Sequence, residues 1–226
     1  MNYLLLAIAV LPPLAICWFI FLLDRHNPEP FEVLFRSFLL GVAACVPAYL
    51  LERMGATLNL DIPDNLWKTA IFAFIIVALS EEVCKFLFLR FYAYEHPAFD
   101  EPLDGIVYSV MVSMGFAAFE NIVYGLTTDT FTLVVRMFTA VPAHAAFGIV
   151  MGYHIGKAKF ERDDTDRIGV GLTAAWLLHG LYDFFLFQQV VPGLQLFAIV
   201  FLFVSLYYAW QLLSELRRDS KKRWSA

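Results

Sequence analysis

Charged residues and cysteines are scarce in this sequence. Only 16% of its 226 residues are charged, whereas 60% are hydrophobic, which excludes an ordinary soluble domain. The three cysteines, Cys17, Cys45 and Cys84, lie in apolar runs without paired spacing, so neither a disulfide framework nor a zinc site built from cysteines is indicated. Nucleophile motifs around serine or cysteine and glycine-rich phosphate loops are also lacking, which disfavours covalent acyl transfer and nucleotide chemistry. No basic patch alternates with aromatic residues, so we expect no nucleic-acid partner.

Long apolar runs make up most of the chain. Seven of them approach membrane-spanning length, at about residues 3–23, 33–51, 67–92, 105–126, 131–156, 168–187 and 194–213. The sequence therefore predicts an all-α fold, a polytopic membrane helix bundle of about seven transmembrane helices that forms a single domain over residues 1–226. The first run has no basic segment before it and no cleavage site, so we expect it to remain as a helix kinked at Pro12-Pro13.

Lysine and arginine are concentrated in two segments. One is the loop after the fifth run, with Lys157, Lys159, Arg162 and Arg167. The other is the basic tail, residues 214–226, with Arg217, Arg218, Lys221, Lys222 and Arg223. Cytoplasmic segments of membrane proteins are enriched in these residues, so both are predicted to be cytoplasmic. Seven crossings then put the N-terminus outside a plasma or inner membrane, and the tail is expected to contact anionic lipid.

The third run contains two acids and a base, in Ser80-Glu81-Glu82-Val83-Cys84-Lys85. Charges at this depth cost roughly 2.5–3.5 kcal/mol each on insertion scales, so they face partners, water or a site. Lys85 is one helical turn from both Glu81 and Glu82 and can reach either carboxylate. We expect only one of the two acids to be ionised, as general acid–base chemistry requires. A purely structural ion pair is an equal alternative.

Three further runs place polar residues at a similar depth. Glu120 and Asn121 lie in the fourth run, where Asn121 follows a row of small residues, Gly105-Ser109-Ser113-Ala117. His144 interrupts a second small row in the fifth run, Ala140-His144-Gly148-Gly152-Gly156. In the sixth run His179 and Asp183 are one turn apart, the spacing at which a carboxylate orients an imidazole. Small rows let helices approach closely, and Asn121 is equally explained as an interhelical hydrogen-bond clamp.

These residue types suit three kinds of chemistry. A carboxylate could activate water while histidine and asparagine stabilise the oxyanion. The same hydrolysis could use zinc, with His144, His179, Asp183 and Glu81 as candidate ligands. The residues could instead form a relay in an ion or proton channel or transporter. A non-enzymatic scaffold, in which the polar groups only hold helices together, is a further alternative. Spacing alone does not choose among them.

The ordered set of motifs resembles the PrsW family of bacterial intramembrane proteases. The matching motifs are Glu81-Glu82-x-x-Lys85, Asp104-Gly105-x-x-Tyr108, Phe119-Glu120-Asn121-x-x-Tyr124, His144-x-x-x-Gly148 and His179-x-x-x-Asp183. Each is weak by itself, but their order on successive helices is specific. The resemblance covers the core motifs at residues 80–183, about half of the chain, and the family is distantly similar to CAAX-processing endopeptidases.

The resemblance implies a protease that makes the first cut in a single-pass membrane protein, an anti-sigma factor, so that a sigma factor is released in a stress response. It implies Glu81 and Glu82 as the general base and its partner, and His144 and His179 as oxyanion or metal residues. Lys85, Glu120, Asn121 and Asp183 would support them. The resemblance leaves open whether zinc is needed, and Lys85 favours a metal-independent reaction because it competes with a cation for the same carboxylates.

Overall fold

The structure is all-α. The computed structural model describes residues 3–161 and 165–224, and Arg162 of the predicted cytoplasmic loop lies outside them. Strands are absent from the described residues. Six segments are long and apolar enough to cross a membrane. They are α1 (Tyr3–Leu23), α2 (Phe31–Thr57), α5 (Pro102–Thr127), α6 with α7 (Thr130–Phe138 and Ala140–Phe160), α8 (Thr165–Phe187) and α9 (Leu196–Trp224).

The remaining span predicted from the sequence is a composite helix. It consists of α3 (Leu66–Ala70), η1 (Ile71–Ala78), α4 (Leu79–Phe88) and η2 (Leu89–Ala93), of which η1 and η2 are π-helical. A π segment changes which side chains face the core and leaves carbonyl groups in need of donors. Trp176 Nε1 of α8 donates to the Phe74 carbonyl at 2.6 Å, and the Ser80 hydroxyl lies 2.5 Å from the Ile76 carbonyl. The irregular turn just before Glu81 is therefore held by side chains on both sides.

The two small rows of the sequence pack against each other. A Cβ atom on Gly105 of α5 would lie 2.4 Å from the Gly152 carbonyl oxygen of α7, and one on Gly148 would lie 2.6 Å from Ser113 Oγ. A Cβ atom on Gly156 would lie 2.0 Å from the Pro102 carbonyl oxygen. The predicted close approach of these helices is confirmed, and it makes α5 and α7 the centre of the bundle. His144 thereby comes to lie inside the bundle and not against lipid.

Two boundaries differ from those expected from hydropathy. α2 continues to Thr57, six residues past the predicted end, so Glu52 lies within a helix. The predicted span at 131–156 is broken at Thr139, whose φ of −122° and ψ of −70° are not helical. Hydropathy alone does not detect either feature. A helical turn that contains charged residues has the hydropathy of a loop, and a break in the helix between apolar residues has the hydropathy of a continuous helix. The break separates α6 from α7 and lets Arg136 reach the interior.

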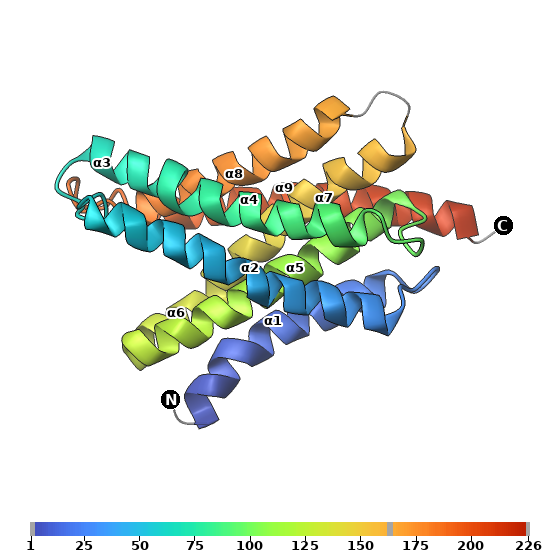
Figure 1. Cartoon of the computed structure of the whole chain (residues 1–226), viewed down its shortest axis with the longest axis horizontal. Helices are drawn as coiled ribbons and strands as arrows, with labels where there is room; N and C mark the ends of the chain where they lie inside the picture. Colours follow the sequence, from blue (N-terminus) through green and yellow to red (C-terminus); the bar gives the residue numbers. More distant parts are fainter. Residues whose placement is uncertain (1–2, 162–164, 225–226) are drawn as a thin grey trace.

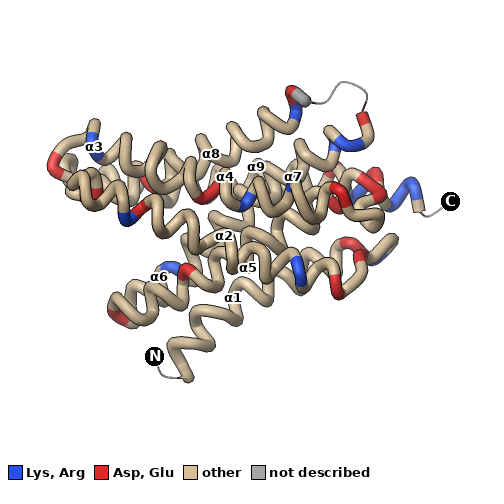
Figure 2. The backbone as a smooth tube through the Cα atoms, in the orientation of Figure 1, with Lys and Arg blue, Asp and Glu red and all other residues tan. Residues whose placement is uncertain are grey.

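The chain ends lie at opposite ends of the bundle (Figure 1). The loops at residues 24–30 and 94–101 lie at the C-terminal end, and those at 58–65 and 188–195 lie at the other (Figure 1). Charged residues gather toward these two ends and leave most of the middle uncharged, with α4 and the Glu120–Arg136 ion pair of α5 and α6 as exceptions (Figure 2). Because the two chain ends lie at opposite ends of the bundle, the arrangement agrees with an odd number of membrane crossings.

Candidate active site

The Lys85 ammonium lies at the centre of a buried polar cluster. Its Nζ is 3.0 Å from Glu81 Oε2, 2.8 Å from Glu82 Oε1 and 3.1 Å from His144 Nδ1. It also lies over the ring of Phe116, 4.2 Å from the centroid. Lys85 and both glutamates are at most 3% exposed. The helical spacing thus brings Lys85 to both acids, as predicted, and the fold adds His144 from α7. Removing one member would leave a buried charge without its partner.

The position of a proton on His144 follows from its neighbours. A lysine ammonium can only donate, so Nδ1 of His144 must accept from Lys85. The remaining ring proton is therefore on Nε2, which lies 2.9 Å from Glu120 Oε2 and donates to it. His144 is thus a neutral imidazole held between a cation and a carboxylate. The ring is also enclosed edge-on by Phe147, with centroids 6.3 Å apart.

His179 of α8 lies between two carboxyl groups. Its Nδ1 is 2.9 Å from Glu82 Oε1, and its Nε2 is 3.1 Å from Asp183 Oδ2. The ring stacks on Phe147 with centroids 4.9 Å apart. Glu82, which is fully buried, therefore contacts both Lys85 and His179 and links α4 to α8. A cationic imidazolium is the form of His179 that satisfies both acids.

Arg136 of α6 lies beside the cluster, next to Glu120 of α5. Its guanidinium forms an ion pair with Glu120 at 2.7 Å, and its Nε donates to Asn121 Oδ1 at 2.8 Å. It also stacks over Tyr124, 3.7 Å from the ring centroid. Asn121 is fully buried and reaches the cluster through Arg136. The sequence assigned no role to Arg136, because the helix break that brings it inward is invisible in the hydropathy pattern.

A cavity of about 170 Å³ adjoins this cluster. This is more than the roughly 30 Å³ that one water molecule takes up in the liquid. Glu81 lines the cavity, whereas Glu82 lies behind it. The other polar lining residues are Glu52, Glu120, Tyr124, Arg136, His144, His179, Tyr182 and Asp183. The four helices singled out in the sequence thus contribute polar groups to one cavity, and Glu81 is the member of the glutamate pair that faces it.

A larger, mostly apolar groove of about 600 Å³ lies between α2 and α5. It shares Glu52, Glu81, Glu120 and Tyr124 with the cavity. The two helices touch closely at Gly41, where a Cβ atom would clash with the Val112 carbonyl, and the groove lies farther along them. Glu52 was missed in the sequence because the predicted span ended at residue 51. Its position one residue past a long apolar run was the only available signal.

Part of the cluster consists of residue types that bind metals. Glu81, Glu82, His144 and His179 offer ligand atoms that all lie within 4.8 Å of one another, and zinc accepts such ligands. Asp183, a candidate from the sequence, is outside this group, because it lies one turn farther along α8 and contacts His179. In the observed arrangement of these side chains there is no position for a metal cation. The Lys85 ammonium takes the position between Glu81, Glu82 and His144, and His179 Nδ1 is bonded to Glu82.

Comparison with known proteins gives one consistent result. A family model described as PrsW family intramembrane metalloprotease matches residues 29–210. Protease PrsW of Geobacillus kaustophilus is 35% identical over 186 residues, which cover 82% of this chain and 80% of the relative. Protease PrsW of Bacillus subtilis is 34% identical, with coverage of 80% and 82%, and that of Clostridioides difficile is 32% identical, with coverage of 92% and 87%.

No solved structure matches the chain. The family match covers most of the sequence, including every motif of the buried cluster, and leaves out α1 and the last part of α9. The identities to curated proteases extend over at least four-fifths of this chain in the three relatives named. The chain therefore belongs to the PrsW family of intramembrane proteases.

Proposed function

We propose that this multi-pass membrane endopeptidase cuts a membrane-anchored protein with a water molecule activated by Glu81. One observation carries the proposal. Glu81 is the only one of the paired acids that lines the cavity, while its neighbour Glu82 is bonded to Lys85 and His179 behind it. A general base must reach the proton that it removes, and of the two paired acids Glu81 is the one that faces the cavity.

The reaction needs two proton transfers. Glu81 takes a proton from water as the water oxygen attacks the carbonyl carbon of the scissile bond. The carbon–nitrogen bond then breaks as the leaving nitrogen takes the proton from Glu81, which yields a new carboxyl group and a new amine. His179, whose two ring nitrogens face Glu82 and Asp183, stabilises the oxyanion through its positive charge, which is fixed in place before the reaction. No step passes through a metal, because Lys85 lies where an ion would have to bind.

The groove between α2 and α5 is the proposed path of the substrate. Its walls include Val46, Tyr49 and Leu50, which are about half exposed on the outside of the bundle. A segment of a single-pass membrane protein could thus enter from the bilayer without passing through water. Glu52 and Tyr124 lie where groove and cavity meet.

The proposed orientation follows the positive-inside rule. The basic end of α9 is cytoplasmic, so the N-terminus is outside. The cavity contains residues near the outer ends of α2 and α5, which agrees with a first cut on the outer side of the membrane. We propose an anti-sigma factor as the substrate class on the strength of the family resemblance.

The test is proteolysis in liposomes that contain the full chain and a tagged single-pass anti-sigma factor. Glu81→Gln keeps the size of the side chain and should lower the cleavage rate at least about 100-fold, the usual contribution of a general base. Glu215→Gln, which removes a carboxylate paired with Lys157 far from the cavity, is the matched control and should cleave normally. Cleavage in ¹⁸O-labelled water should put one label in the new carboxyl group. Equal rates for Glu81→Gln and the wild-type chain would refute the proposal.

A further inference from the structure

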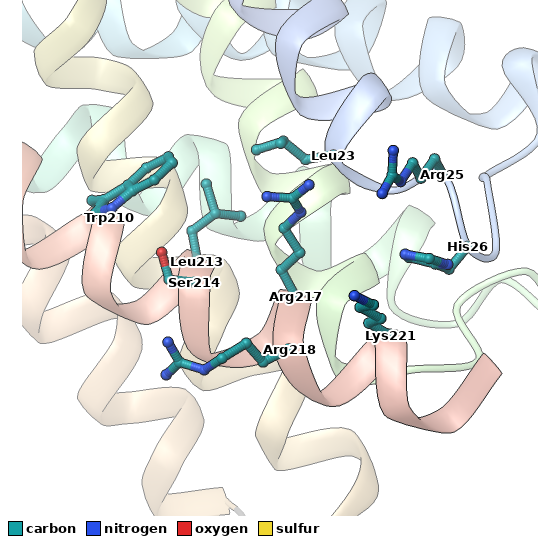
Figure 3. Close-up of a pocket in the computed structure, with 9 residues that line it drawn as sticks. All are labelled: Leu23, Arg25, His26, Trp210, Leu213, Ser214, Arg217, Arg218 and Lys221. Carbon is teal, nitrogen blue, oxygen red and sulfur yellow. The ribbon is translucent and has the colours of Figure 1, made fainter. Parts of the chain in front are cut away.

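A second pocket lies at the other end of the molecule from the groove. It has a volume of about 310 Å³ and lies between the loop after α1 and the last turns of α9 (Figure 3). Its lining residues are Leu23, Arg25, His26, Trp210, Leu213, Ser214, Arg217, Arg218 and Lys221. None of them belongs to the candidate active site.

The pocket is strongly basic. Four lysine or arginine residues and one histidine line it, and no acid does. Arg218 interacts electrostatically with Glu215 one turn earlier on α9. Arg25, His26, Arg217 and Lys221 form no hydrogen bond or ion pair within the described part of the chain, whereas the neighbouring Lys222 lies 3.5 Å from Asp219. Arg25, His26, Arg217 and Lys221 extend toward one another (Figure 3). Like charges this close repel, so the arrangement is suited to an anion.

The remaining lining residues place the pocket at the edge of the membrane. Leu23 is the last residue of α1, and the apolar part of α9 ends at Leu213. From Leu196 to Leu213 the helix rises about 27 Å, close to the thickness of a bilayer core. Trp210 is half exposed beside the pocket, and tryptophan is enriched at membrane interfaces. The cations are therefore at the level of the lipid headgroups, with an apolar floor toward the acyl chains.

We propose that this pocket binds the phosphate group of an anionic phospholipid. The phosphate would pair with Arg25, Arg217 and Lys221, and the acyl chains would pass along Leu23, Leu213 and Trp210. Bound lipid would thereby connect α9 with the loop that follows α1. That loop also contacts the centre of the bundle, since the Tyr108 hydroxyl of α5 donates to Glu29. The proposal is independent of the proteolytic chemistry.

The test compares two variants of the full chain that lose the same charge from the same helix. Arg217→Gln/Lys221→Gln removes two cations from the pocket, and Lys222→Gln/Arg223→Gln removes two that do not line it. Each chain is titrated in detergent with phosphatidylglycerol, with phosphatidylcholine and with inorganic phosphate, and binding is followed by native mass spectrometry and thermal unfolding. We expect phosphatidylglycerol to bind the wild-type chain and the control variant alike, and the pocket variant roughly 30-fold more weakly.

Three results would overturn the proposal. Equal weakening in both variants would mean that only the net charge of the tail matters. Equal binding of phosphatidylcholine would mean that the anion is not recognised. Binding of inorganic phosphate that displaces the lipid and depends on the same residues would assign the pocket to a free anion. If the double variant does not fold, Arg25→Gln in the exposed loop replaces it, with an expected loss of about 5-fold because only one cation is removed.

Discussion

At the scale of single residues, one buried cation organises the candidate active site. Lys85 contacts two carboxylates and an imidazole, and no other ammonium or guanidinium among the described residues contacts Glu81 or Glu82. The protein therefore places its own positive charge where a metalloprotease would hold an ion. If Lys85 replaces a metal ion in this way, cleavage should depend on Lys85 and should not depend on added metal.

Replacing Lys85 tests this assignment. Lys85→Gln should leave the buried Glu81 without a cation and Glu82 with His179 alone, so we expect a loss of about 3–5 kcal/mol in the free energy of unfolding and no measurable cleavage. Removing metals should have no effect on the wild-type chain. Cleavage after treatment with 1,10-phenanthroline, and elemental analysis of the purified protein, provide the measurement. Loss of activity that added zinc restores would mean that Lys85 moves aside for an ion in the active enzyme.

Asp24, in the loop after α1, predicts how stability depends on pH. Burial, with a smaller effect of the Asp104 and Glu101 carboxylates, raises its pKa from an ordinary 3.8 to about 8. The folded chain thus keeps a proton that the unfolded chain loses above pH 4, so stability falls as the pH rises from about 4 to 8. Asp24→Asn removes this dependence. Its melting temperature should exceed that of the wild-type chain by a margin that grows from pH 5 to pH 8, whereas Asp219→Asn on the exposed tail should follow the wild-type curve.

Contacts within one helix were predictable from the sequence, and contacts between helices were not. The bonds from Lys85 to Glu81 and Glu82 follow from a spacing of four and three residues. The bonds from Lys85 to His144 and from Glu82 to His179 join residues 59 and 97 positions apart. They depend on the rotation of each helix about its axis, which a π segment changes in the composite span. The sequence predicted that these buried polar side chains would lie close together. It did not predict which of their atoms would form hydrogen bonds.

At the scale of helices, the packing of α5 against α7 determines where His144 lies. Both helices use glycine at their closest points, where any side chain would meet backbone atoms that cannot move away. A Cβ atom on Gly152 would lie 2.3 Å from the Gly105 carbonyl oxygen. This contact was predictable because rows of small residues at a spacing of four are visible in the sequence. The break at Thr139 has no such pattern.

Two alanine substitutions should therefore have opposite effects. Gly152→Ala adds a methyl group at the contact with Gly105 and should lower the free energy of unfolding by about 2–3 kcal/mol. Gly169→Ala on α8 has nothing within 4 Å of the new atom and should raise it by a few tenths to about 1 kcal/mol, because alanine favours helix more than glycine does. Thermal unfolding in detergent measures both. Similar melting temperatures for the two variants would contradict the close packing.

At the scale of the whole molecule, the distribution of charge relates the fold to the membrane. Charged residues gather at both ends of the bundle (Figure 2), and the chain ends lie on opposite sides. Hydropathy predicted the class of fold, because apolar length is a property of each segment alone. The cavity and the groove could not be predicted, since they arise where helices diverge. The angle between two helices depends on the contacts between them and cannot be derived from the sequence of either helix alone.

The orientation in the membrane is the prediction that belongs to this scale. In a chain whose three native cysteines are replaced by alanine, Asp61→Cys in the loop at residues 58–65 should react with a membrane-impermeant maleimide in intact cells, because that loop shares the end of the bundle with the N-terminus. Lys222→Cys near the end of α9 should react only after the membrane is permeabilised. If the two sites exchange behaviour, the basic tail is outside and the site would act on the cytoplasmic side. If both react in intact cells, the chain crosses the membrane an even number of times between them, whereas five crossings separate them here.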